Sequence, residues 1–335
     1  ETSEHPPAST DAPFPFNSPS ADVILQSSDN VRFRVRKAIL SEASPVFDNM
    51  FSLPPEQANL GSSAFPNLPI VPMSEDSATL EGILRLCYPP DGSLRKISLD
   101  TISRLFPVLR KYALDRAEAY VVETLRSMAE TAPLRVYCLS IQYELDEDLT
   151  RAAARAFLGE SVHSVHTYSA AELDCVSASA YIRLLDYHRR CVTAARDAVA
   201  GFLAADTKLT ERCWATCNPG KQGYCNTFQT LQVNGFERSI MSWFINLVSY
   251  CIRLVEDRPS GRVIRSPATV KTSLTEALRC ASCKRRAWDD VQEFSFLVQA
   301  AIDQATAQVA IEAVVSLGNR NSLGFSAGFD QHCAA

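Results

Sequence analysis

The chain has 335 residues, of which 46% are hydrophobic and 21% charged, and its formal net charge is −5. A chain of this length can hold about two ordinary domains, and its apolar content is sufficient to build a core in each. The acidic balance argues against a nucleic-acid-binding surface that extends over the whole chain.

No stretch of the sequence reaches the roughly 18 consecutive apolar residues that a membrane-spanning helix needs. The first residues lack the basic-then-apolar layout of a secretory signal peptide. The chain contains 11 cysteines, and without a secretory signal these indicate a reducing compartment, with buried thiols or a metal site. We therefore expect an intracellular protein, in the cytoplasm or the nucleus, with no membrane partner.

The beginning of the chain predicts a tail and then a first strand. Residues 1–20 are rich in Pro, Ser, Thr and Ala, a composition that predicts a disordered tail. An apolar run follows at residues 23–25, which we interpret as a short strand. Turn-forming residues at 28–30 end this strand and indicate a reversal of the chain.

A second strand and a capped helix are predicted next. Val31, Phe33 and Val35 alternate with arginines, which is the period-two signature of a strand with one buried face. Ser44-Pro45 combines a helix N-cap with a proline at the first helical position. We therefore expect a short helix to begin there.

Helical periodicity then dominates up to residue 129, after one more strand. The predicted strand and helices lie at residues 68–73, 77–88, 98–112 and 116–129. Pro69 and Pro72 confine the strand to a sheet edge, and Pro107 predicts a kink or a split in the second of these helices. Residues 54–67 have loop character and are interpreted as an insertion.

These elements and the residues in them resemble a BTB/POZ domain. The family pattern is roughly D-V-x-L, a strand ending in F-x-V-H-K, and then x-x-L-x-x-x-S-x-V-F-x-x-M-F. The residues that fit it are Asp22, Val23, Leu25, Phe33, Val35, Lys37, Leu40, Ser44, Val46, Phe47, Met50 and Phe51. Arg36 departs from the pattern, because the family has a histidine at this corner between strand and helix. The resemblance extends more weakly to about residue 128.

After Pro133 the pattern becomes helical throughout. Candidate helices lie at residues 133–144, 147–157, 169–206, 233–255, 268–281 and 288–316. The chain resembles BTB proteins of the fungal, basidiomycete-like type, which carry a C-terminal helical region. The expected fold is an α+β BTB/POZ domain, with a short mixed sheet flanked by helices, followed by an all-α helical domain. The expected organisation is a disordered tail over 1–20, the BTB/POZ domain over 21–130, the all-helical domain over 131–317 and a flexible tail over 318–335.

Five cysteines in two tight groups are the best candidate for a functional site. Cys213, Cys217 and Cys225 lie within RCWATCNPGKQGYC, and Cys280 and Cys283 form a C-x-x-C pair far downstream. Zinc prefers four soft ligands in a tetrahedron, and a C-x-x-C turn can present two thiolates to one ion. Two such half-sites would staple the loop at residues 205–230 to the helix predicted to start near Ala268, so a structural zinc is one interpretation.

The fungal BTB proteins resemble the chain at these cysteines, with a Trp-x-x-Cys followed by a distant Cys-x-x-Cys. Residues 214–217 and 280–283 match these two motifs, but the next cysteine of the family pattern would fall on Gly220. Either Cys213 or Cys225 must therefore supply the fourth ligand. The alternative is that all five are free cysteines, some of them buried, as is common for thiols.

The resemblance implies a protein-interaction module and not an enzyme, so we expect no catalytic residue and no cofactor other than zinc. BTB domains typically self-associate, often as dimers. Some of them bring cullin-type ubiquitin ligases to a substrate that a second domain holds. The expected partners are therefore proteins: a second copy in a homodimer, or a cullin.

A BTB-type transcription regulator with a zinc-supported C-terminal domain is the alternative function. It would need a basic surface patch, and the triplet 284–286 is the candidate that follows the C-x-x-C pair. A single triplet is smaller than the basic footprint of a nucleic-acid-binding protein. We therefore expect no nucleic-acid partner.

Overall fold

The computed structural model describes residues 9–53, 68–88, 97–163, 173–174, 176–205, 211–218, 225, 227–233 and 236–310. They form two compact units, one that ends at Ser127 and one that begins at Met128. The predicted insertion at 54–67 and the predicted tail at 318–335 lie outside the described residues.

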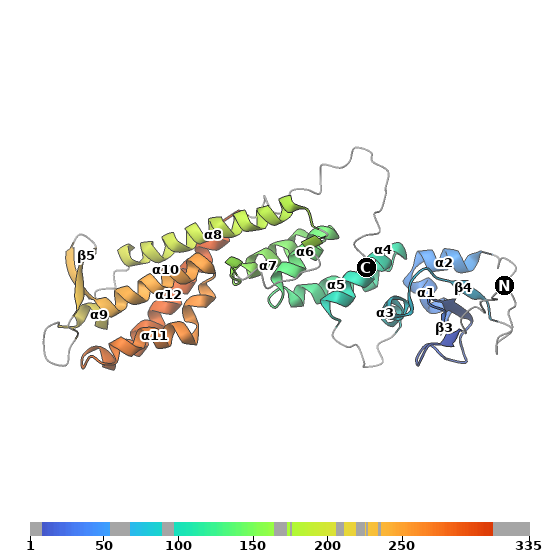
Figure 1. The fold of residues 1–335 in the computed structure, drawn as a ribbon, viewed down its shortest axis with the longest axis horizontal. Coiled ribbons are helices and arrows are strands. Elements are labelled where there is room, and N and C mark those ends of the chain that lie inside the picture. The colour runs from blue at the N-terminus through green and yellow to red at the C-terminus, as the bar shows by residue number, and fades with distance from the viewer. Residues whose placement is uncertain are drawn as a thin grey trace, which may run out of the picture. The chain divides into compact units, whose positions relative to one another are not determined.

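The first unit is built on a four-stranded mixed sheet of order β1-β3-β2-β4 (Figure 1). Its strands are β1 (Thr10–Asp11), β2 (Val23–Gln26), β3 (Val31–Val35) and β4 (Ile70–Pro72). β2 and β3 are antiparallel and pair Leu25 with Phe33, whereas β1 and β4 run parallel to their neighbours. Phe33 and Val35 are buried, which confirms the one buried face predicted from the alternation with arginine.

Five helices complete the first unit: α1 (Lys37–Ala43), α2 (Pro45–Ser52), α3 (Ser77–Cys87), α4 (Leu99–Lys111) and α5 (Asp115–Met128). Ser44 caps α2 as predicted, because its hydroxyl accepts a hydrogen bond from the Phe47 N–H at 3.0 Å. The same hydroxyl donates to the carbonyl of Tyr112 at the end of α4. α4 is not split at Pro107 and runs unbroken, with a buried apolar face on both sides of the proline.

The prediction of a disordered tail over residues 1–20 is wrong for residues 9–20. β1 lies in the sheet beside β3, and the Arg34 N–H donates to the carbonyl of Phe16 at 2.8 Å. Phe16 is fully buried, with its ring centroid 5.8 Å from that of Phe33. The Pro- and Ser-rich composition of this segment predicts disorder, but the single residue Phe16 anchors it in the core.

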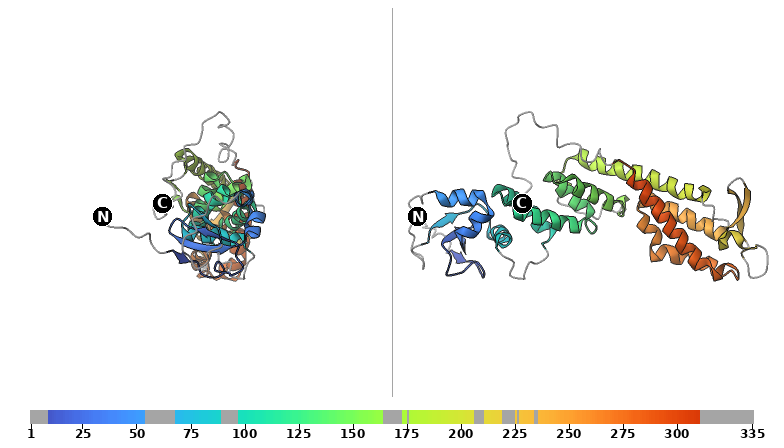
Figure 2. Two further views of the ribbon diagram at one scale, coloured as in Figure 1. Left: turned by 90° about the vertical axis from the view of Figure 1, so that its right-hand side faces the viewer. Right: turned by 180° about the vertical axis from the view of Figure 1, so that it is seen from behind.

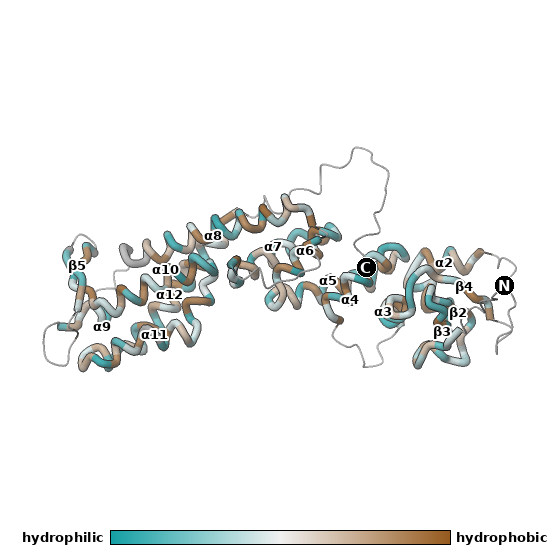
Figure 3. Tube along the Cα trace, viewed as in Figure 1, coloured by the Kyte–Doolittle hydropathy of each residue, from teal (hydrophilic) through white to brown (hydrophobic). Residues whose placement is uncertain are grey.

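The second unit is mainly helical, and its helices from residue 178 onward share one hydrophobic core. The elements are α6 (Pro133–Gln142), α7 (Glu147–Phe157), α8 (Ala178–Ala205), α9 (Cys213–Thr216), α10 (Ser242–Asp257), α11 (Pro267–Ala277), α12 (Ala287–Ala307) and the 3₁₀ turns η4 (Gly261–Arg265) and η5 (Cys283–Arg285). α8, α10 and α12 lie side by side in views from both sides (Figures 1 and 2). Hydrophobic and hydrophilic residues alternate along these helices (Figure 3), as expected for helices that bury one face. Among the described residues, every helix is too short or too polar to cross a lipid bilayer.

Within the described residues, a β-hairpin departs from the all-helical domain that we expected. β5 (Phe228–Val233) and β6 (Phe236–Met241) are antiparallel and pair Phe228 with Met241. The helix predicted over 233–255 therefore begins only at Ser242. Ile240 and Met241 therefore enter the core from a strand and not from the face of a helix.

Candidate metal centre

Four of the five candidate cysteines gather at one place in the second unit. The sulfur atoms of Cys217, Cys225, Cys280 and Cys283 all lie within 4.8 Å of one another. Cys217 Sγ is 3.6 Å from Cys280 Sγ, and Cys225 Sγ is 3.7 Å from Cys283 Sγ. Ligand sulfurs at the corners of a tetrahedron with zinc–sulfur bonds of about 2.3 Å lie about 3.8 Å apart. The donor set and its spacing therefore fit a four-thiolate zinc site.

Short turns at the ends of helices present these thiols. Cys217 directly follows α9 as its C-cap, and Cys280 and Cys283 lie in the connection between α11 and α12. The Cys283 N–H donates to Cys280 Sγ at 3.4 Å, which fixes the turn of the C-x-x-C pair and favours a thiolate at Cys280. Cys225 is half-buried and the other three are buried.

Burial and neighbouring hydrogen bonds set the pKa values of the clustered thiols. Burial raises the pKa of Cys217 to about 11 and also raises the pKa of Cys225. Burial opposes ionisation of Cys280 as well, but the Cys283 N–H and the neighbouring thiols lower its pKa to about 7. Four thiolates this close repel one another strongly, and a bound divalent cation reverses that balance because it deprotonates the thiols that coordinate it.

Cys213, the fifth candidate, is a neighbour of the cluster and not one of its four members. Its N–H donates to Asp290 Oδ2 at 2.7 Å, and its carbonyl accepts a hydrogen bond from Cys283 Sγ at 3.6 Å. The sequence left Cys213 and Cys225 as alternatives for the fourth position. The geometry brings Cys225 to the other three thiols.

A buried ion-pair network that the sequence did not reveal holds the segment that carries Cys217. Arg212 is buried and contacts Asp290 at 3.5 Å, and it also pairs with Glu293. Asp290 is itself buried and accepts the Cys213 N–H, so it links α12 to the start of α9. Local sequence patterns do not reveal this network, because Arg212 and Asp290 lie far apart in the chain.

An aromatic cluster also packs against this segment. Trp214 is fully buried, and its ring stacks on Phe244 of α10 with centroids 4.0 Å apart. Trp243 and Phe294 meet Trp214 edge to face, each at 6.0 Å. The Trp of the Trp-x-x-Cys motif therefore anchors α9 in the core, and Cys217 follows at a fixed position.

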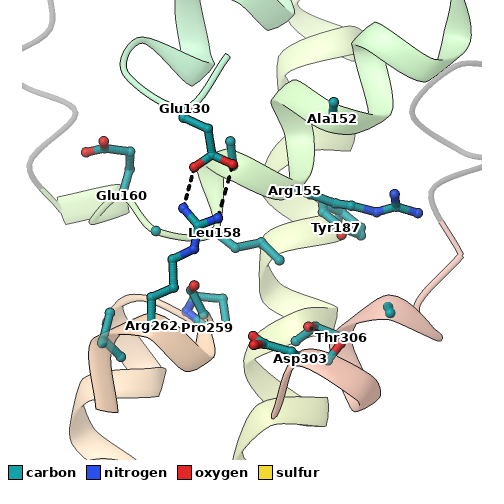
Figure 4. A pocket seen from close by; sticks show the side chains of 15 residues that line it. Glu130, Ala152, Arg155, Leu158, Glu160, Tyr187, Pro259, Arg262, Asp303 and Thr306 are labelled. Atoms are coloured by element: carbon teal, nitrogen blue, oxygen red, sulfur yellow. Dashed lines mark hydrogen bonds and ion pairs between the residues drawn. The ribbon is translucent and has the colours of Figure 1, made fainter. Parts of the chain in front are cut away.

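A separate cavity of 640 Å³ opens on the second unit, between α7, α8, η4 and α12. The carboxylate of Glu130 and the guanidinium of Arg262 form a two-pronged ion pair at one side of it, and Asp303 and Thr306 lie at another (Figure 4). Its described lining contains neither cysteine nor histidine. The described residues of this cavity therefore offer no thiol or imidazole ligand to a metal.

Comparison with known families identifies the first unit. The model of the BTB/POZ domain family matches residues 16–128, about a third of the chain. The chain therefore carries a BTB/POZ domain, a small mixed sheet flanked by helices, and a helical region follows it. This confirms the expected fold class. The BTB/POZ domain is a protein-interaction fold and not a catalytic one. A search of curated proteins finds no match to the chain.

Proposed function

We propose that this chain is a non-enzymatic adaptor, in which the BTB/POZ domain self-associates or recruits a cullin-type ubiquitin ligase and the helical unit holds a protein partner. The observation that carries the proposal is the pairing of a BTB/POZ domain at residues 16–128 with a second unit that has its own hydrophobic core. Such a chain acts by positioning, because joining two binding modules raises the effective concentration of one partner near the other.

A pull-down with the tagged full chain tests this function. Recovery of a cullin together with its RING partner, and not with the tag alone, is the expected result for an adaptor. Sedimentation velocity of the purified chain tests self-association separately. A monomeric chain that recovers no cullin would contradict the proposal.

We also propose that Cys217, Cys225, Cys280 and Cys283 hold one structural zinc ion. The observations that support it are the four sulfurs within 4.8 Å and the two pairs at 3.6 and 3.7 Å. Closed sites of four protein ligands are typical of structural zinc. The ion would hold the segment after α9 and the turn after α11 together.

The same cysteine pattern supports two further parts of the proposal. Its Trp-x-x-Cys and Cys-x-x-Cys motifs resemble those of fungal, basidiomycete-like BTB proteins, so we assign the chain to that type. A four-thiolate site requires reduced cysteines, and the described cysteines are free thiols. We therefore place the protein inside the cell, in the cytoplasm or the nucleus.

A BTB-type transcription regulator is the second candidate, because Lys284 and Arg285 are exposed directly after the metal-binding pair. Heparin chromatography separates the two functions, since binding to phosphate or sulfate groups depends steeply on salt. An adaptor elutes at low salt. Retention to high salt that is lost in the K284Q/R285Q double variant would favour the regulator.

A further inference from the structure

The hairpin of the second unit has an open edge along β5. The Ser242 N–H donates to the carbonyl of Thr227 at 3.1 Å, so the backbone groups of Thr227 face β6. Backbone groups alternate in direction along a strand. The N–H and carbonyl groups of Phe228, Thr230 and Gln232 therefore face away from β6. Within the described residues, no backbone hydrogen bond joins these outward groups to another segment.

β5 also lacks the features that protect an edge strand. Soluble proteins commonly blunt such edges with charged residues, proline or bulges. The β5 sequence FQTLQV contains no charged residue and no proline, and Phe228 is 46% exposed. β6, by contrast, carries Glu237 and Arg238. A two-stranded hairpin is marginally stable by itself, so a third strand along β5 would also stabilise the hairpin.

We propose that β5 pairs antiparallel with β5 of a second copy of this chain, which joins the two hairpins into one four-stranded sheet. A strand without charge selects neither an acidic nor a basic peptide, but it pairs with itself without repulsion between like charges. The pairing is isologous, since the outward groups of one copy meet the same groups of the other. It adds a self-contact in the helical unit that does not depend on the BTB/POZ domain.

Hydrogen exchange of the full chain tests this pairing at the amides of Phe228, Thr230 and Gln232. Wild-type protein should exchange them at least about tenfold more slowly than an open edge does. T230K and T230E each place like charges against each other in the paired sheet, so each variant alone should lose the protection. An equimolar mixture of the two variants pairs opposite charges and should restore it.

The control is E237Q, which changes the net charge by the same amount as T230K but lies on β6. It should keep the protection of the three β5 amides. Fast exchange of these amides in concentrated wild-type protein would overturn the proposal. Protection that survives in T230K would assign the edge to another part of the same chain and would overturn the proposal. Failure of the mixture to restore protection would show that the two copies do not pair through Thr230, and it would overturn the proposal as well. Self-association through the BTB/POZ domain is read separately, because T230K leaves that domain unchanged.

Discussion

The sulfur atoms of Cys217 and Cys280 lie 3.6 Å apart, although 63 positions separate the two residues in the chain. This contact closes a long loop of the chain, from Cys217 to Cys280, that contains the β5–β6 hairpin and α10. Closing a long loop through a metal makes the binding energy of the metal part of the folding energy. The stability of the second unit should therefore depend on the four thiols.

Loss of one thiol from the cluster should weaken the second unit. C280S removes a ligand and the sulfur that accepts the Cys283 N–H. We expect a lower melting temperature, and we expect a chelator to lower it in wild type but hardly further in the variant. The three tryptophans of the chain, Trp214, Trp243 and Trp288, all lie in this unit, so their fluorescence reports its unfolding. An unchanged melting temperature in C280S and after chelation would contradict a structural role for the metal.

Asp290 should matter far more than the aspartate beside it. D290A leaves the buried Arg212 without one of its two carboxylate partners and leaves the Cys213 N–H without an acceptor. Breaking a buried ion pair from one side costs about 3 kcal/mol of the free energy of unfolding. D289A changes the exposed neighbour and should stay within about 0.5 kcal/mol of wild type. Urea unfolding followed by tryptophan fluorescence measures both values, and equal effects would refute the role of the network.

Ser44 should matter far more to the stability of the BTB/POZ domain than Ser52 does. S44A removes the cap of α2 and the hydrogen bond to the carbonyl of Tyr112, which together cost about 2 kcal/mol. S52A removes an exposed serine hydroxyl that bonds only within α2, and we expect a loss of less than about 0.5 kcal/mol. Because the first unit contains no tryptophan, hydrogen exchange of its core amides is the suitable measurement. Equal protection of those amides in S44A and S52A would contradict the prediction.

Acid should destabilise the second unit through His188. Burial lowers the pKa of His188 from 6.5 to about 4, against the opposing charge of Asp257. The unfolded chain binds a proton at this histidine below about pH 6.5, while the folded chain does not until about pH 4. The stability that the neutral histidine contributes is therefore present above pH 6.5 and is lost as the pH falls toward 4.

The expected loss is about 1.4 kcal/mol per pH unit within that window. H188Q cannot take up this proton, so the free energy of unfolding should fall less steeply with acid in the variant than in wild type. The carboxylates titrate in both proteins, so their contribution cancels when the pH dependence of the free energy of unfolding is compared between wild type and H188Q. Identical slopes for wild type and H188Q would show that His188 does not carry the effect.

In the first unit, local sequence patterns predicted those strands and helices that can be recognised from their own residues alone. The alternation around Phe33 and the cap at Ser44 needed no knowledge of distant residues. The burial of Phe16 did need it, because a two-residue strand such as β1 forms only where a neighbouring strand offers an edge. Composition alone therefore assigned residues 9–20 to a disordered tail.

The hairpin of the second unit could have been predicted. Asn234-Gly235 lies between β5 and β6, and this dipeptide is the strongest short-range signal of a hairpin. The apolar residues of β6 continue directly into α10, so the whole stretch resembles one helix and the hairpin signal was overlooked. For the cysteine cluster, spacing gave the candidates but could not decide between Cys213 and Cys225. That decision depends on where α9 ends and on the ion pair between Arg212 and Asp290.

The zinc content of purified, metal-replete full chain is the most direct test of the four-thiol centre. We predict one equivalent of zinc per chain in wild type and in C213S, because Cys213 lies beside the cluster without belonging to it. We predict substoichiometric zinc in C225S, which removes the fourth ligand. Absence of zinc from wild type, or loss of zinc in C213S with full retention in C225S, would contradict the account.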